Sequence, residues 1–167
     1  FFIYDRAKGL GLFDVVHAAL VLEHVPDAIG FISEMKKMLK KGGHLAIFCP
    51  NDYNPLQLIL RKEHGFKPWW VVPKHHLNYF TVESMKRLLE RLGFVIEDVL
   101  GTFPLETFLL SGRNYVGDHI VGRACHKDRK AFELMLYKKD SDILNNLYTG
   151  LATAGIGREF LIIARKK

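Results

Sequence analysis

The stretch that most constrains the fold runs from Phe13 to Asn51, within a chain of 167 residues. It opens with an apolar run, Val15–Leu22, in which His17 is the only polar residue. Polar and apolar residues do not alternate along this run. It therefore predicts a strand buried on both faces, as in the middle of a parallel sheet.

A helix and a second strand are predicted after this run. Asp27 is the expected N-cap, because its carboxylate can accept hydrogen bonds from amides of the first turn. Apolar residues recur at helical spacing from 28 to 39, and Gly42-Gly43 is expected to end the helix. A second apolar strand follows at Leu45–Cys49. Two strands joined by such a helix form a βαβ unit, so we expect them to be parallel.

The charge balance leaves two interpretations open. The chain has 24 basic and 18 acidic residues, a formal net charge of +6 and a pI near 9.3. Such an excess is compatible with binding to nucleic acid or to an anionic membrane. The lysines, however, gather on the solvent faces and at the ends of predicted helices. We therefore expect a solvated charge and no nucleic-acid partner.

Cysteine usage and hydropathy bear on the compartment. Cys49 and Cys125 are the only cysteines, and Cys49 lies within an apolar strand. Two cysteines cannot form a disulfide framework, so we expect a reducing compartment and a cytoplasmic protein. No apolar run approaches the ~20 residues of a membrane span, and no charged leader precedes an apolar segment.

The rest of the chain predicts further helices and strands. Asn54-Pro55 is a helix-start pattern, and Thr81 is the expected N-cap of a later helix. Residues 105–122 are expected to be irregular, with at most a short helix. The remaining predicted elements are helices at Val82–Leu92, Ala124–Lys138 and Ser141–Ala152, and strands at Phe94–Leu100 and Glu159–Lys167.

Two groups of residues carry a resemblance to a known family. The segments FDVV, LEHVPD and MLKKGGHLAIFCPN, all within 13–51, resemble the second half of a class I S-adenosylmethionine-dependent methyltransferase. The segment HHLNYFTVESMKRLLERLGF, residues 75–94, is similar to the same family. The resemblance implies an α/β fold, a partial Rossmann-like methyltransferase domain. Its mostly parallel sheet would carry helices on both faces and an antiparallel last strand.

The same resemblance implies a strand order. The strand at 15–22 would lie in the middle of the sheet beside 44–49. The strand at 159–165 would be inserted antiparallel between 44–49 and 94–100.

The family's first strand and its Gly-rich turn, an acid followed by G-x-G-x-G, have no counterpart before Phe13. Gly9 and Gly11 do not supply the turn, because a strand rather than a helix follows them. We therefore expect residues 1–167 to form a single methyltransferase domain that lacks its N-terminal third. Alone, it is expected to bind S-adenosylmethionine weakly and to be inactive.

The resemblance also implies residues for the cofactor, S-adenosylmethionine. Asp5 occupies the place of an acid that accepts from the adenine amino group, although a solvated loop aspartate is an equal interpretation. Ala18, Ala19 and Leu20 lie where backbone carbonyls approach the methionine amine, at the carboxyl end of a strand.

His24 is the best candidate for a general base, because imidazole takes up a proton near neutral pH. The alternative role is an orienting hydrogen bond at the mouth of the helix. No metal ion is expected: some quinone-pathway relatives combine an acid at the place of Leu20 with the Glu-His pair, and leucine cannot ligate. His75 and His76 are adjacent, so in a strand their rings would point to opposite faces.

The acceptor pocket is expected to include Asn51, Trp70 and Tyr79. For Trp70, filling the edge of the core is the alternative role. The resemblance implies methyl transfer to a small-molecule or lipid-like acceptor. Two alternatives stay open: a non-catalytic methyltransferase-like domain that binds no cofactor, and an RNA methyltransferase, for which the net charge is weak support.

One partner is expected from the sheet itself. In the family sheet, the missing first strand would flank the strand at 15–22. This strand is apolar and has no Lys, Pro or bulge-forming Gly, the residues that normally block edge pairing. We therefore expect self-association through it.

Overall fold

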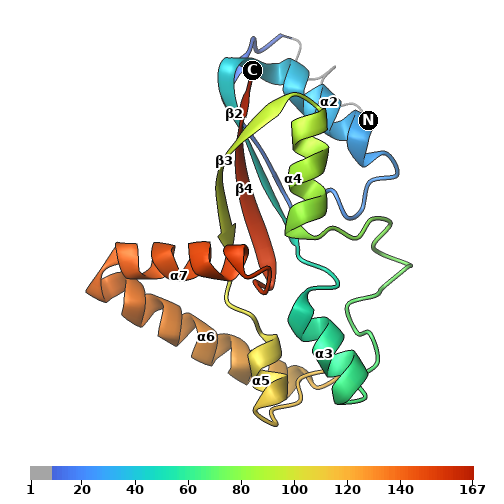
Figure 1. Ribbon diagram of the computed structural model, residues 1–167, viewed down its shortest axis with the longest axis vertical. Helices are drawn as coiled ribbons and strands as arrows, with labels where there is room; N and C mark the ends of the chain where they lie inside the picture. The colour runs from blue at the N-terminus through green and yellow to red at the C-terminus, as the bar shows by residue number, and fades with distance from the viewer. Residues whose placement is uncertain (1–8) are drawn as a thin grey trace.

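The computed structural model describes residues 9–167, and Figure 1 shows their arrangement. Asp5 and the β-prone run Phe1–Tyr4 lie outside the described residues. In chain order the elements are β1 (Phe13–Ala19), α2 (Ala28–Met38), β2 (Leu39–Pro50), α3 (Pro55–Glu63), α4 (Val82–Arg91), β3 (Phe94–Gly101), α5 (Glu106–Leu110), α6 (His119–Lys139), α7 (Ser141–Thr153) and β4 (Glu159–Lys166).

The four strands form one mixed sheet in the order β1-β2-β4-β3. β1 and β2 are parallel, as predicted for the βαβ unit. β4 lies between β2 and β3 and is antiparallel to both, which confirms the predicted insertion of the last strand. The prediction of a mostly parallel sheet is wrong. Because β4 separates β2 from β3, the β1–β2 pair is the only parallel pair within residues 9–167.

The strand β1 differs from its prediction in length and in position. It ends at Ala19, because Leu20 adopts a left-handed backbone conformation with φ +53° that leaves the strand. It lies at the edge of the described sheet rather than in the middle, and it pairs only with β2. The predicted burial of both faces is therefore wrong, and Val15 is 58% exposed.

The prediction that the glycine pair Gly42-Gly43 ends the helix is wrong. The Asp27 side chain caps α2 as expected, accepting from the Gly30 amide at 2.8 Å, but the helix ends at Met38 and β2 begins at once. Gly42, with φ +75°, and Gly43 instead lie in an irregular part of β2. A Cβ on Gly43 would lie 3.0 Å from the Asp14 carbonyl oxygen, so this glycine allows β1 to approach closely.

One face of the sheet is covered by α2 and α4, which lie along the same side in Figure 1. A capping box begins α4: Thr81 accepts from the Ser84 amide, and Ser84 accepts from the Thr81 amide. The core contains buried apolar residues from α2, α4 and the strands, among them Phe31, Ile32, Met35, Leu45, Ile47, Met85, Leu89, Phe94, Phe160 and Ile162.

The helices α6 and α7 form a hairpin that projects to one side of the sheet (Figure 1). The buried Glu133 carboxylate holds the two helices together. It accepts from the Arg129 guanidinium at 2.6 Å on its own helix and from the Tyr148 hydroxyl at 2.7 Å on α7. Within residues 9–167, no helix is both long enough and apolar enough to cross a membrane.

The exposed edge of β1 generates a prediction. We propose that the chain self-associates through this edge, because its outward amides and carbonyls have no strand partner among residues 9–167. Light scattering at micromolar concentration should give a mass above the 19.2 kDa of one chain. Val15→Lys should restore the single-chain mass, since an edge lysine opposes pairing. A wild-type protein that stays at 19.2 kDa would contradict the proposal.

Candidate functional site

The carboxyl ends of β1 and β2 face a loop that follows α3 in the chain. The segment after β1 is held there by residues 77–78. The Glu23 carbonyl accepts from the Leu77 amide at 2.7 Å and from the Asn78 amide at 3.1 Å. The Asn78 side-chain amide donates to the Leu22 carbonyl at 3.0 Å and to the Val25 carbonyl at 2.6 Å. One rigid edge is thus formed by residues 22–25 and 77–78, which are about 50 positions apart in the sequence.

The predicted base, His24, stands on this edge with its side chain half-exposed. Its Nδ1 lies 2.6 Å from the His75 carbonyl oxygen. A carbonyl can only accept, so Nδ1 carries the hydrogen and donates it. The lone pair of a neutral His24 imidazole is therefore on Nε2. The orienting hydrogen bond and the base role, which were posed as alternatives, use different nitrogens of the same ring.

A buried carboxylate lies beside that lone pair. Glu23 is 2% exposed, and its Oε1 lies 3.7 Å from His24 Nε2. The His76 ring packs edge-on against His24, and its buried Nδ1 has no hydrogen-bond partner among the described residues. Burial, with His24 nearby, lowers the pKa of His76 and favours its neutral form.

Glu23, His24 and His76 could together hold a small divalent cation. Their donor atoms lie within 4.8 Å of one another, whereas tetrahedral ligation needs separations of about 3.4 Å. The three side chains would have to close by roughly 1 Å. The expectation of no metal rested on Leu20 and on the adjacency of His75 and His76, and it stays a prediction. Of that pair, His76 alone joins the cluster, and it lies on a different loop from Glu23 and His24.

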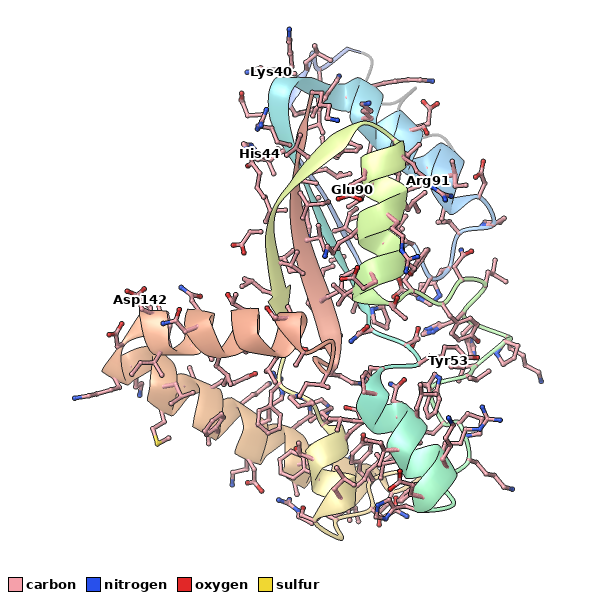
Figure 2. All side chains as sticks on the ribbon, viewed as in Figure 1. Lys40, His44, Tyr53, Glu90, Arg91 and Asp142 are labelled. Atoms are coloured by element: carbon pink, nitrogen blue, oxygen red, sulfur yellow. The ribbon has the colours of Figure 1, made fainter. Side chains whose placement is uncertain are left out.

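Aromatic rings continue from His76 along the same edge. Tyr79 lies next to His76, and Tyr53 contacts both Tyr79 and Trp70 edge-on, with ring centroids 6.0 and 5.7 Å apart. Figure 2 labels Tyr53, which projects between α3 and the loop on the right. Tyr53 adopts φ +56°, a conformation that is unfavourable for a tyrosine and is found preferentially at functional sites. Sequence reasoning missed this residue.

Two of the predicted acceptor residues belong to this ring cluster. Trp70 is 4% exposed, and its indole nitrogen has no partner among the described residues. Tyr79 orients the loop, because its hydroxyl accepts from the Val72 amide at 3.0 Å. Trp70 thus fills the edge of the core and at the same time keeps an unused donor there.

The third predicted acceptor residue, Asn51, is used by the protein itself. Its side-chain amide donates to the Gly155 and Gly157 carbonyls, each at 2.9 Å, and its oxygen accepts from the Val82 amide at 3.2 Å. Both amide hydrogens are occupied, so Asn51 positions the surrounding segments and has no donor left for an acceptor.

The residue after Asn51 was not considered in the sequence and is the most perturbed acid of the site. Asp52 is 3% exposed, and its Oδ2 has no partner in the described part of the chain. Burial raises the pKa of Asp52 to about 6, and the Glu23 and Glu106 carboxylates add to the rise, while Arg158 opposes it. A polar residue directly after a buried strand was the available sequence indication.

An ion pair between α5 and Arg158, the residue before β4, acts on the Asp52 pKa. The fully buried Glu106 accepts from the Arg158 guanidinium at 2.8 Å and from the Gln57 amide at 3.1 Å. Arg158 is the basic residue that opposes the rise in the Asp52 pKa. Sequence reasoning missed this pair, since its members are 52 residues apart.

The residues predicted for the cofactor lie at the end of β1. Ala18 is buried, whereas Ala19 and Leu20 are exposed. The Leu20 amide donates to the Phe48 carbonyl of β2 at 2.9 Å, which anchors the turn. The cofactor role of these three residues stays a prediction.

Comparisons with known proteins identify the family of the chain. The family model described as "Methyltransferase domain" matches residues 2–99. A Mycolicibacterium smegmatis protein named as an S-adenosylmethionine-dependent methyltransferase is 32% identical over 92 residues, which cover 54% of this chain and 32% of that protein. The ubiquinone biosynthesis O-methyltransferase of Aeromonas salmonicida is 29% identical over 117 residues, which cover 65% of this chain and 48% of that protein.

The chain thus spans about a third and about half of the lengths of these two relatives. Among solved structures, a mycolic acid cyclopropane synthase complexed with SAH and CTAB matches with a TM-score of 0.50 at 13% identity. That match covers 93% of this chain and 56% of the other, and it supports the fold alone.

The Asp52 environment predicts a pH-dependent stability. Because its pKa is raised from 3.8 to about 6, the folded state binds this proton more tightly than the unfolded state does. Stability is therefore lost as pH rises through this window and is not regained above it. Asp52→Asn removes the loss. Relative to the wild type, the variant should gain free energy of unfolding, and this gain should be roughly 1–3 kcal/mol larger at about pH 8 than at about pH 4.

Urea denaturation of both proteins at the two pH values measures this difference. The exposed Asp142, labelled in Figure 2 far from the site, provides the control. Asp142→Asn should not become relatively more stable as pH rises. Equal effects of Asp52→Asn at both pH values would show that Asp52 is already ionised at the lower one.

Proposed function

The chain belongs to the methyltransferase domain family, and from this premise we propose that it forms the acceptor-side part of an S-adenosylmethionine-dependent methyltransferase. The proposed acceptor is a small molecule or a lipid-like compound. One observation carries the proposal: the family-matched residues 2–99 include both segments of the rigid edge that holds His24 beside the buried Glu23. We further propose that residues 1–167 act as one domain.

The residues proposed to hold the cofactor are Ala18, Ala19 and Leu20, at the end of β1. When bound, S-adenosylmethionine supplies a sulfonium-activated methyl group. Transfer of such a group is a displacement that depends mainly on proximity and alignment. The anchored turn at Leu20 and the small side chains before it keep the backbone in place for that alignment. Asp5 stays a proposed adenine contact.

The base proposed for a hydroxyl or amine acceptor is His24. Its Nδ1–H donates to the His75 carbonyl, which leaves the Nε2 lone pair to take the acceptor proton. The Glu23 carboxylate, 3.7 Å from Nε2, would stabilise the imidazolium that forms. The His75 carbonyl thus orients the imidazole, and the Glu23 carboxylate provides its counter-charge.

The acceptor is proposed to lie against the ring cluster of Trp70, Tyr79 and Tyr53. Edge-packed aromatic rings with few polar groups favour a ligand that has an apolar or delocalised body. Asn51 serves this site indirectly, by holding the end of β2 in place.

Cofactor binding is tested by hydrogen exchange on the protein, with and without S-adenosylhomocysteine. Peptides that cover residues 18–24 should gain protection, and peptides from α6 should not change. Unchanged exchange at 18–24 with saturating ligand would overturn the proposed cofactor site. Residues 1–167 alone are expected to bind this ligand only in the millimolar range, as measured by calorimetry; micromolar binding would show that these residues suffice.

The base role is tested with His24→Gln, which keeps a donor but has no base. Turnover should fall by roughly 10²–10⁴-fold, with cofactor affinity little changed. Methyl-labelled S-adenosylmethionine would be supplied with three acceptor pools: a lipid extract, an aqueous small-molecule extract and total RNA. The exposed His64 provides the matched control, His64→Gln. A loss below about tenfold would leave His24 with its orienting role, and labelling of RNA alone would reject the proposed acceptor class.

A further inference from the structure

The outer face of α6 carries a basic cluster that no ion pair neutralises. The cluster consists of Arg123, His126, Lys127 and Lys130, all exposed. None of the four has a salt bridge or side-chain hydrogen bond within residues 9–167. The two carboxylates of this helix are already engaged: Asp128 binds Arg113 at 2.6 Å, and Glu133 binds Arg129.

Large apolar side chains lie exposed on the same helix. Ile120 is 74% exposed, Leu134 is 54% and Met135 is 58%. At 100° per residue, Leu134 falls in line with the basic cluster, and Ile120 and Met135 fall on the neighbouring stripe. The exposed half of α6 therefore carries both basic and large apolar side chains.

A groove joins the two kinds of side chain. Its volume is about 560 Å³, and it is lined by Arg123, His126, Lys127, Lys130, Ala131 and Leu134. No carboxylate of the described residues lines it. The α6–α7 hairpin projects from the sheet in Figure 1, so this face lies away from the core formed by the strands.

Charge complementarity selects the occupant of this face. A second copy of α6 would bring one basic cluster against another, which is repulsive. Nucleic acid would match the charge but would leave the exposed aliphatic side chains without a partner. An anionic bilayer matches both: its headgroups attract Lys and Arg, and its interfacial region accepts aliphatic side chains.

We propose that the exposed face of α6 is a docking surface for anionic lipid bilayers. In this arrangement α6 lies parallel to the membrane, with Ile120, Leu134 and Met135 in the interface and the basic cluster at the headgroups. The proposal does not depend on the methyltransferase function, since none of these residues belongs to the candidate site.

Vesicle co-sedimentation of the full chain tests the proposal. Vesicles of phosphatidylcholine with roughly 30 mol% phosphatidylglycerol should bring down the protein at about 0.1 M salt, and pure phosphatidylcholine vesicles should not. Raising the salt to about 0.5 M should weaken binding to the vesicles. Millimolar inorganic phosphate should not displace the protein from them. Protein that stays in the supernatant with the anionic vesicles would overturn the proposal and leave an acidic protein as the occupant.

Charge-reversal variants locate the surface. Lys127→Glu with Lys130→Glu should lower the partition coefficient at least about 25-fold, because each lysine contributes about fivefold. Lys41→Glu with Arg91→Glu changes the net charge equally at the opposite end of the molecule, where Figure 2 labels Arg91. This control should retain most of the binding. If the two double variants lose binding equally, the net charge alone accounts for it and the proposal fails.

The apolar half of the face is tested separately. Ile120→Ser with Leu134→Ser leaves the charge unchanged and should reduce binding at least about tenfold. Circular dichroism should show unchanged helix content, since both side chains are exposed. Unreduced vesicle binding by this variant would mean that the basic cluster acts alone and that α6 does not insert.

Discussion

The side chain of Asn51 connects three segments on which the candidate site depends. From the end of β2 it binds the turn before β4 through two carbonyls and the first amide of α4 through its oxygen. These bonds anchor the turn before β4, which pairs antiparallel with both β2 and β3. They also place the start of α4, and with it the loop that carries His75, His76 and Tyr79. A buried side chain with every hydrogen bond satisfied gives this junction a single geometry.

The candidate site combines a well-satisfied frame with several unsatisfied polar atoms. Backbone hydrogen bonds between the segments at Glu23 and Asn78 hold the frame. Asp52 and His76, in contrast, each bury an atom that has no partner in the described residues. Burying such an atom destabilises the folded protein unless a ligand provides its hydrogen-bond partner. Their gathering at the carboxyl ends of two parallel strands is what connects the fold to a binding function.

The same chain presents two surfaces that differ in chemistry. The edge of β1 offers unpaired backbone groups and is apolar, so it suits pairing with another strand. The face of α6 offers unpaired positive charges beside aliphatic side chains. Both follow from how the elements are placed: among residues 9–167, β1 pairs with β2 alone, and α6 packs through its opposite face onto α7.

The sequence by itself determined most elements, and it predicted the antiparallel insertion of β4 through the family resemblance. Local chemistry explains this success: Asp27, Asn54 and Thr81 cap their helices through bonds to amides three residues away. The missing first strand indicated an open edge at β1, but the apolar composition of Val15–Leu22 wrongly predicted burial on both faces, because burial depends on neighbours and not on composition. The Gly42-Gly43 pair was misread for a similar reason, since its close approach to β1 is a contact between strands.

For the site, the sequence pointed to His24, which lies beside a proline-containing turn, but could not determine which of its nitrogens is free. Only the tertiary structure decided that, by placing the His75 carbonyl 2.6 Å from Nδ1. It also brought together Asp52, Glu106 and Arg158, which are far apart in sequence, and turned a tryptophan pair and Tyr53 into one ring cluster. Hydrogen bonds and charge effects act over a few ångströms in space, so residues about 50 or more positions apart show no pattern until the chain is folded.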